Sequence, residues 1–166
     1  MWDKKVEPIT RTPEKALSIL KWMCSRQERT RKTCVESMKR WNVDEKFHAE
    51  ILKTLEEEKY INEMRYATMY INDKANFNKW GKSKIISNLI MKGVDKETIE
   101  NAFEESDFNN SDSQDSLTEL LAKKEPKVKA QNSYQKRQKL AQWAYTRGYS
   151  FDQINKSLDI ILQNED

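Results

Sequence analysis

The chain has 166 residues, of which 37% are hydrophobic and 34% charged, and its formal net charge is +3. Only three glycines and three prolines occur, fewer than the tight turns of a β-rich fold need, so the composition favours helices. Because there is no run of about 18 apolar residues, no secretory signal and no disulfide framework, we expect a cytoplasmic protein without a membrane segment.

The first predicted unit spans residues 13–60 and follows an N-terminal arm at residues 1–12. A Thr-Pro pair at the boundary is a helix start, with Thr as the N-cap and Pro at the first helical position. Apolar residues at helical spacing then predict three helices in succession, the second of them from Thr30 to Trp41. The unit therefore reads as a three-helix bundle.

The same succession of three helices is predicted twice more, at residues 61–105 and at residues 117–166. Between these two units lies the segment SDFNNSDSQDS, residues 106–116, which is polar except for one Phe. Its Asn, Asp and Ser content is typical of a connection without regular structure. We therefore predict a flexible acidic linker there, followed by a short helix that ends at Pro126.

One position recurs after the second helix of every unit and is occupied by Asn42, Gly93 and Gly148. A left-handed backbone is favoured directly after a helix, and Gly or Asn adopts it at the lowest cost. The regular recurrence of this corner is typical of a helical repeat. The sequence alone therefore predicts an all-α fold of three tandem three-helix repeats.

Three segments resemble the RecX family, bacterial modulators of the RecA recombinase. KYINEMRYATMYI (59–71), GKSKIISNLIMKGVDKETIENAF (81–103) and KRQKLAQWAYTRGYSFDQI (136–154) resemble the family's characteristic stretches, in the family's order. SRQERTRKTCVESMKRWNV (25–43) is a weaker match. The sequence departs from the family pattern at Glu63, at Asn42 and at Ser83, which bears on fine contacts with a partner more than on the fold.

The RecX resemblance implies that the repeats form an elongated, curved array. It also implies a non-enzymatic regulatory protein that binds in the helical groove of the RecA–DNA filament. Such a protein would inhibit strand exchange and ATP hydrolysis by RecA in DNA repair, recombination and the SOS response. We expect a monomer whose partners are the RecA filament and single- and double-stranded DNA, bound without sequence preference.

Residues that could carry catalysis or hold a metal are scarce. His48 is the single histidine and has no Cys or His at ligand spacing. Cys24 and Cys34 fall on apolar helical positions and are expected in the core. The isolated glycines do not form a phosphate-cradling loop. We therefore predict no catalytic residue, no metal site and no cofactor, and hence no enzyme.

Clusters of basic residues are the better candidates for a binding site. Such clusters commonly form only a solvated face, but they can also contact phosphates without reading bases. The start of the helix at Gly81 suggests a phosphate-facing N-terminus. The candidate residues for nucleic-acid and filament binding are Lys123, Lys124, Lys127, Lys129, Lys136, Arg137, Lys139, Lys79, Trp80, Lys82, Lys84, Arg29, Arg31 and Lys32.

Aromatic residues could add stacking contacts to these clusters. Trp22, Trp41 and Trp143 have the helical spacing of core residues, whereas Trp80 lies in a loop-like segment and is expected to be exposed, as is Tyr134. Two other functions stay open at this stage. One is a general, sequence-tolerant DNA-binding protein that acts without RecA; the other is an adaptor between proteins.

Overall fold

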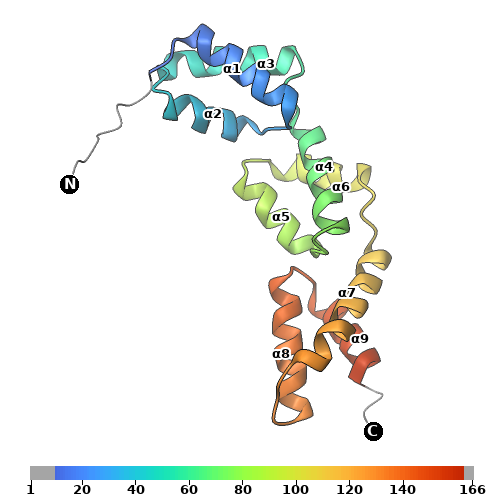
Figure 1. The fold of residues 1–166 in the computed structure, drawn as a ribbon. Helices are drawn as coiled ribbons and strands as arrows, with labels where there is room; N and C mark the ends of the chain where they lie inside the picture. The colour runs from blue at the N-terminus through green and yellow to red at the C-terminus, as the bar shows by residue number, and fades with distance from the viewer. Residues whose placement is uncertain (1–9, 163–166) are drawn as a thin grey trace, which may run out of the picture.

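The helices are grouped in three units that follow one another in an elongated, curved array (Figure 1). The structure is a computed structural model and describes residues 10–162. Residues 1–9 of the predicted N-terminal arm therefore lie outside the described range. Within that range no strand is present, and no helix is both long and apolar enough to cross a membrane.

Each unit contains three α-helices, and the first and third also contain a short 3-10 helix. The first unit consists of α1 (Pro13–Arg26), α2 (Arg31–Arg40), η1 (Glu45–Phe47) and α3 (His48–Glu57). The second consists of α4 (Glu63–Asn76), α5 (Lys82–Met91) and α6 (Lys96–Glu105). The third consists of α7 (Asn110–Lys124), η2 (Glu125–Lys127), α8 (Ser133–Thr146) and α9 (Phe151–Leu162).

Short polar side chains at the N-caps explain where many of the helices begin. Each accepts a hydrogen bond from a backbone N–H in the first turn, which would otherwise have no partner. Asn62 Oδ1 accepts from the N–H of Arg65 at 2.8 Å, and Asp95 Oδ1 accepts from that of Thr98 at 2.9 Å. The other caps of this kind are Thr12, Thr30, Asp44 and Asn132.

Every unit has an apolar core of its own. The first packs Leu20, Met38 and Leu55 together with its neighbours, and the other two units have separate clusters built in the same way. Cys24 and Cys34 both lie in the first core, as expected. A hydrogen bond with Cys24 and burial raise the pKa of the Cys34 thiol, so it stays protonated and chemically inert.

The polar segment at residues 106–116 is more ordered than the sequence indicates. Helix α7 begins at Asn110, so the prediction of a flexible linker is wrong for its second half. The amide nitrogen Nε2 of Gln114 donates to the carbonyl of Gln153 at 3.0 Å and to Ser157 Oγ at 2.7 Å. These bonds anchor α7 to α9, and tertiary contact therefore outweighs weak helix propensity.

The three corner residues adopt the left-handed backbone that the repeat predicts. The φ angle is 50° at Asn42, 87° at Gly93 and 88° at Gly148. The next residue turns back onto the helix that has just ended. Its side chain is almost fully buried, with exposed fractions of 4% for Val43 and 2% for Tyr149. The repeated corner thus has a structural cause in all three units.

The second helices of the three units, α2, α5 and α8, meet end to end along the array (Figure 1). Lys32, in the first turn of α2, donates from Nζ to the carbonyl of Met91 at the end of α5, at 2.7 Å. Lys84, in the first turn of α5, donates in the same way to the carbonyl of Thr146 at the end of α8, at 3.2 Å. An ammonium beside the carbonyl end of a helix is favourable, so one lysine joins each pair of units.

Candidate nucleoprotein interface

The junction lysines, Lys32 and Lys84, were both candidates for binding nucleic acid. The structure places their ammonium groups on carbonyls of the next unit instead. Lys84 is half-buried, and its Nζ also lies 4.5 Å from the centre of the Trp80 ring. The geometry gives both lysines a structural role in joining units, which sequence clustering alone did not reveal.

The N-terminus of α5 is not the open phosphate site that its glycine suggests. The N–H of Gly81 donates to the carbonyl of Arg147 at 2.8 Å, and the N–H of Ser83 donates to that of Gly148 at 3.2 Å. These amides therefore bond to the corner of the third unit. A Cβ on Gly81 would lie 2.2 Å from the Gly148 carbonyl oxygen, so close approach of two backbones requires glycine here.

The loop before α5 is also used in this junction. Lys79 has a φ of 52°, and its carbonyl accepts a hydrogen bond from the hydroxyl of Tyr149 at 2.9 Å. Trp80 lies in this loop, as expected, but it is half-buried against the second core, so the expectation that it is exposed is wrong. Its ring lies beneath the ammonium groups of Lys74 and Lys84. Lys82 is exposed, with Nζ 4.7 Å from the Phe103 ring centre.

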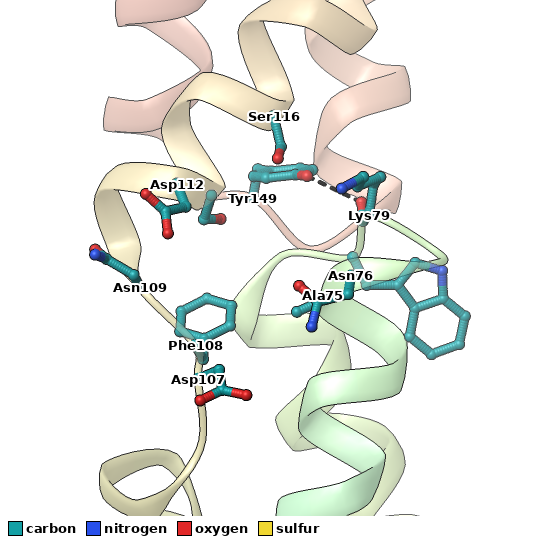
Figure 2. Close-up of a pocket in the computed structure, with 11 residues that line it drawn as sticks. Ala75, Asn76, Lys79, Asp107, Phe108, Asn109, Asp112, Ser116 and Tyr149 are labelled. Carbon is teal, nitrogen blue, oxygen red and sulfur yellow. Dashed lines mark hydrogen bonds between the residues drawn. The ribbon is translucent and has the colours of Figure 1, made fainter.

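Figure 2 shows the pocket beside this loop, where the Tyr149 ring of the third unit reaches Lys79 of the second. Burial raises the pKa of Tyr149 to about 12, so its hydroxyl stays protonated and can donate. Asp107 and Asp112, which also line the pocket, are exposed. Within the described range, no group of three or more His, Cys, Asp or Glu residues is placed to hold a metal.

The basic cluster of the first unit is partly engaged in contacts within the protein. Arg31 forms an ion pair with Glu56, and its backbone N–H donates to Glu63 Oε1 at 3.3 Å. Arg29 is half-buried. Arg31 and Lys32 therefore contribute to the junction between the first and second units, and the charge of Arg31 is already paired.

The run from Lys123 to Lys139 divides into engaged and exposed members. Lys136 is ion-paired with Glu125, and Arg137 Nη2 lies 2.8 Å from Asp159 Oδ1. Lys124 is half-buried, with Nζ 5.8 Å from the centre of the Trp143 ring. These three side chains hold α7, α8 and α9 together.

The exposed members of the run are Lys123, Lys127, Lys129 and Lys139, which we call the distal basic surface. Lys139 Nζ donates to the carbonyl of Lys129 at 2.7 Å, which brings α8 next to the loop that follows η2. Lys123 has one exposed partner, Glu119, at 3.7 Å. An exposed ion pair of this kind is weak and leaves the ammonium available to solvent.

Trp22 is the second tryptophan, after Trp80, whose exposure differs from the prediction. Trp22 is 61% exposed, although its helical spacing predicted a core residue; Arg26 lies 5.4 Å from its ring centre. Trp41 and Trp143 are half-buried and pack against the first and third cores, in line with their spacing. Tyr134 is 67% exposed.

The second and third three-helix units match known protein domains. The domain described as "RecX, second three-helix domain" matches residues 62–102, and "RecX, third three-helix domain" matches residues 111–158. The chain belongs to the RecX family. RecX proteins are named regulatory proteins, and the all-α repeat array is the fold expected of the family.

Two curated RecX relatives illustrate the degree of similarity. Regulatory protein RecX of Leuconostoc mesenteroides is 31% identical over 153 residues, which cover 92% of this chain and 57% of that protein. Regulatory protein RecX of Bacillus cytotoxicus is 26% identical over 160 residues, which cover 96% of this chain and 57% of that protein. The chain thus spans a little over half the length of these relatives.

Two crystal structures of RecX proteins share the fold. One regulatory protein RecX superposes with a TM-score of 0.79 at 25% identity, covering 92% of this chain and 73% of that chain. RecX from Lactobacillus salivarius also gives a TM-score of 0.79, at 24% identity, covering 91% of this chain and 97% of that chain. The arrangement of the helical units is therefore one that RecX crystal structures also adopt.

Proposed function

We propose that this chain is a non-enzymatic regulator that binds the RecA–DNA filament and inhibits ATP hydrolysis and strand exchange by RecA. Membership of the RecX family is the observation that carries the proposal. The protein would act in the cytoplasm as a monomer, during DNA repair and recombination. An elongated array suits this role because it can lie along a groove and touch several subunits of a filament.

The proposed contact with the filament is the distal basic surface. Its four lysines are exposed, whereas Lys124, Lys136 and Arg137 are engaged within the third unit. Exposed ammonium groups bind phosphates and acidic side chains without reading sequence. The clusters around Arg31 and Lys84 are weaker candidates, since their charges already serve the junctions.

The proposal is tested by measuring ATP hydrolysis by RecA on single-stranded DNA as this protein is added. We expect the rate to fall, and we expect a variant with Glu at Lys123, Lys127, Lys129 and Lys139 to lose most of the inhibition. A matched control places Glu at four exposed lysines of the first two units, Lys15, Lys46, Lys53 and Lys96. It has the same net charge change and should inhibit like the parent.

An unchanged rate at stoichiometric protein would refute the regulatory proposal. Equal loss of inhibition in both variants would instead show that net charge matters and that the distal basic surface does not. A general DNA-binding protein without action on RecA would bind naked DNA tightly, and its affinity would depend steeply on salt. When RecA covers the same amount of DNA, such a protein would leave the rate of ATP hydrolysis by RecA unaltered.

A further inference from the structure

Two large aromatic rings lie exposed on either side of the corner at Gly148. Tyr145, in the last turn of α8, is 52% exposed, and Phe151, the first residue of α9, is 66% exposed. Their ring centres are 5.1 Å apart and their planes differ by 22°, so the rings are stacked. We call these two residues the aromatic pair.

The other two corners show that the fold does not need aromatic residues at these positions. Three residues before and after Asn42 stand Lys39 and Glu45, which form an exposed ion pair at 3.7 Å. The equivalent residues around Gly93 are Ile90 and Lys96, which are both exposed and of which one is apolar and one charged. The aromatic pair also lies outside the buried core of the third unit. Neither corner geometry nor core packing therefore accounts for it.

The surroundings of the aromatic pair are basic and polar. One groove that includes both rings is lined by Gln138, Lys139, Ala141 and Gln142. A second groove, also lined by both rings, is lined by Lys84 and by the polar residues Ser83, Ser87, Thr146 and Ser150. Neither groove is lined by a carboxylate. Lys139 makes the first groove continuous with the distal basic surface.

We propose that the aromatic pair binds unpaired bases of a single-stranded nucleic acid. Exposed flat rings offer stacking faces, the amides and hydroxyls offer hydrogen bonds to base edges, and Lys139 offers a charge for the backbone phosphates. Bases inside a duplex are already stacked and cannot reach the rings. The pair therefore selects single strands over duplex, without sequence preference. This extends the proposed function but does not require RecA.

The test is binding of a fluorescent oligothymidylate to the full chain, measured by anisotropy in the absence of RecA. Replacing the pair (Tyr145→Ala with Phe151→Ala) should weaken binding by at least about fivefold, the effect of losing one stacked base. Duplex binding should change much less. Tyr145→Phe keeps the ring and should bind like the parent. Trp22→Ala, at an exposed aromatic residue of the first unit, is the matched control and should have no effect.

A salt series separates stacking from charge. The alanine double variant should keep the parent's dependence of affinity on salt, whereas Lys139→Gln should reduce the slope by about 0.7, the contribution of one phosphate contact on a single strand. Unchanged oligonucleotide binding by the double variant would overturn the proposal, and so would an equal loss for single strands and duplex. A double variant that binds oligonucleotide normally but fails to inhibit RecA would assign the pair to a protein contact. If the parent protein has no effect on RecA but the double variant still loses oligonucleotide binding, only the regulatory proposal is refuted.

Discussion

The two junctions between units join the same helix ends but are held by different kinds of bond. Between the second and third units, backbone groups bond directly: the N–H groups of Gly81 and Ser83 donate to corner carbonyls. The buried hydroxyl of Tyr149 and the guanidinium of Arg147, which donates to the Asn78 carbonyl at 3.2 Å, complete the junction. This junction depends on close approach and on mostly neutral hydrogen bonds.

Between the first and second units, charged side chains make most of the contacts. Lys32 bonds to the Met91 carbonyl, and Arg65 Nε lies 2.5 Å from Glu28 Oε1 in a partly exposed ion pair. The atom nearest to a Cβ on Gly93 would be the Cβ of Lys32, at 2.9 Å. One architecture can therefore be joined either by close backbone contact with mostly neutral hydrogen bonds or by partly exposed ion pairs, which salt screens.

Gly148→Val should cause the largest loss of stability. The residue has a φ of 88°, and a Cβ there would lie 2.4 Å from both the backbone nitrogen and the Cβ of Lys84. Backbone strain and overpacking each cost about 1–3 kcal/mol. We therefore expect the free energy of unfolding to fall by about 3 kcal/mol or more, as measured by urea denaturation followed by circular dichroism.

The matched control for this prediction is Gly93→Val. Its φ of 87° gives the same backbone strain, but the nearest atom to an added Cβ is the Cβ of Lys32 at 2.9 Å, against 2.4 Å for the nearest atoms at Gly148. The expected loss is about half that of Gly148→Val, because the added Cβ overlaps much less with its nearest neighbour. Equal losses at the two glycines would show that close backbone contact does not distinguish the junctions.

Tyr149→Phe should remove the bond to the Lys79 carbonyl and lower the free energy of unfolding by about 1 kcal/mol at neutral pH. The same variant tests the raised pKa. In the parent, the unfolded chain loses the Tyr149 proton near pH 10, while the folded chain keeps it up to a pKa of about 12. The contribution of the hydroxyl is therefore complete below about pH 10 and declines between about pH 10 and 12.

The measurement compares unfolding midpoints of parent and Tyr149→Phe at several pH values. One pH unit above the free tyrosine pKa, ionisation of Tyr149 in the unfolded chain lowers the parent's free energy of unfolding by about 1.4 kcal/mol. The parent should therefore be no more stable than Tyr149→Phe by about pH 11. Tyr66 and Tyr70, whose pKa values burial also raises, are present in both proteins and cancel. A constant difference across this range would contradict the buried, proton-donating hydroxyl.

Arg65→Gln should have the smallest effect and should depend on salt. The ion pair with Glu28 is partly exposed, so we expect a loss of about 0.5 kcal/mol at low salt. In about 1 M salt the loss should nearly vanish because the charges are screened. The cost of Tyr149→Phe, a neutral bond, should stay the same. A salt-independent effect of Arg65→Gln would remove the proposed contrast between the junctions.

Local features of the fold could be predicted because they depend on neighbouring residues. The corners at Asn42, Gly93 and Gly148 and the N-caps at Asn62 and Asp95 are each determined by a few consecutive positions. Helical spacing predicted the three cores in the same way. The resemblance of three segments to RecX proteins then predicted the family and the array.

Features that join distant segments could not be predicted from clusters of charge. Lys84 bonds to a carbonyl 62 residues away, so its place in a basic cluster suggested phosphate binding. The start of α7 at Asn110 depends on bonds from Gln114 to α9, and Trp22 faces outward on a helix whose spacing alone indicated burial. One feature of the sequence could have indicated the junctions between units: a lysine occurs in the first turn of both α2 and α5.

The end-to-end contact of α2, α5 and α8 has a consequence for how such proteins change in length over evolution. The middle unit carries both halves of a joint, a lysine at the start of its second helix and a corner glycine at the end. Duplication of such a unit would bring its lysine to the corner glycine of its own copy, because each unit of a linear array contacts only its neighbours. An ancestor with few units could therefore give rise to longer descendants by copying, and the joints could diverge afterwards.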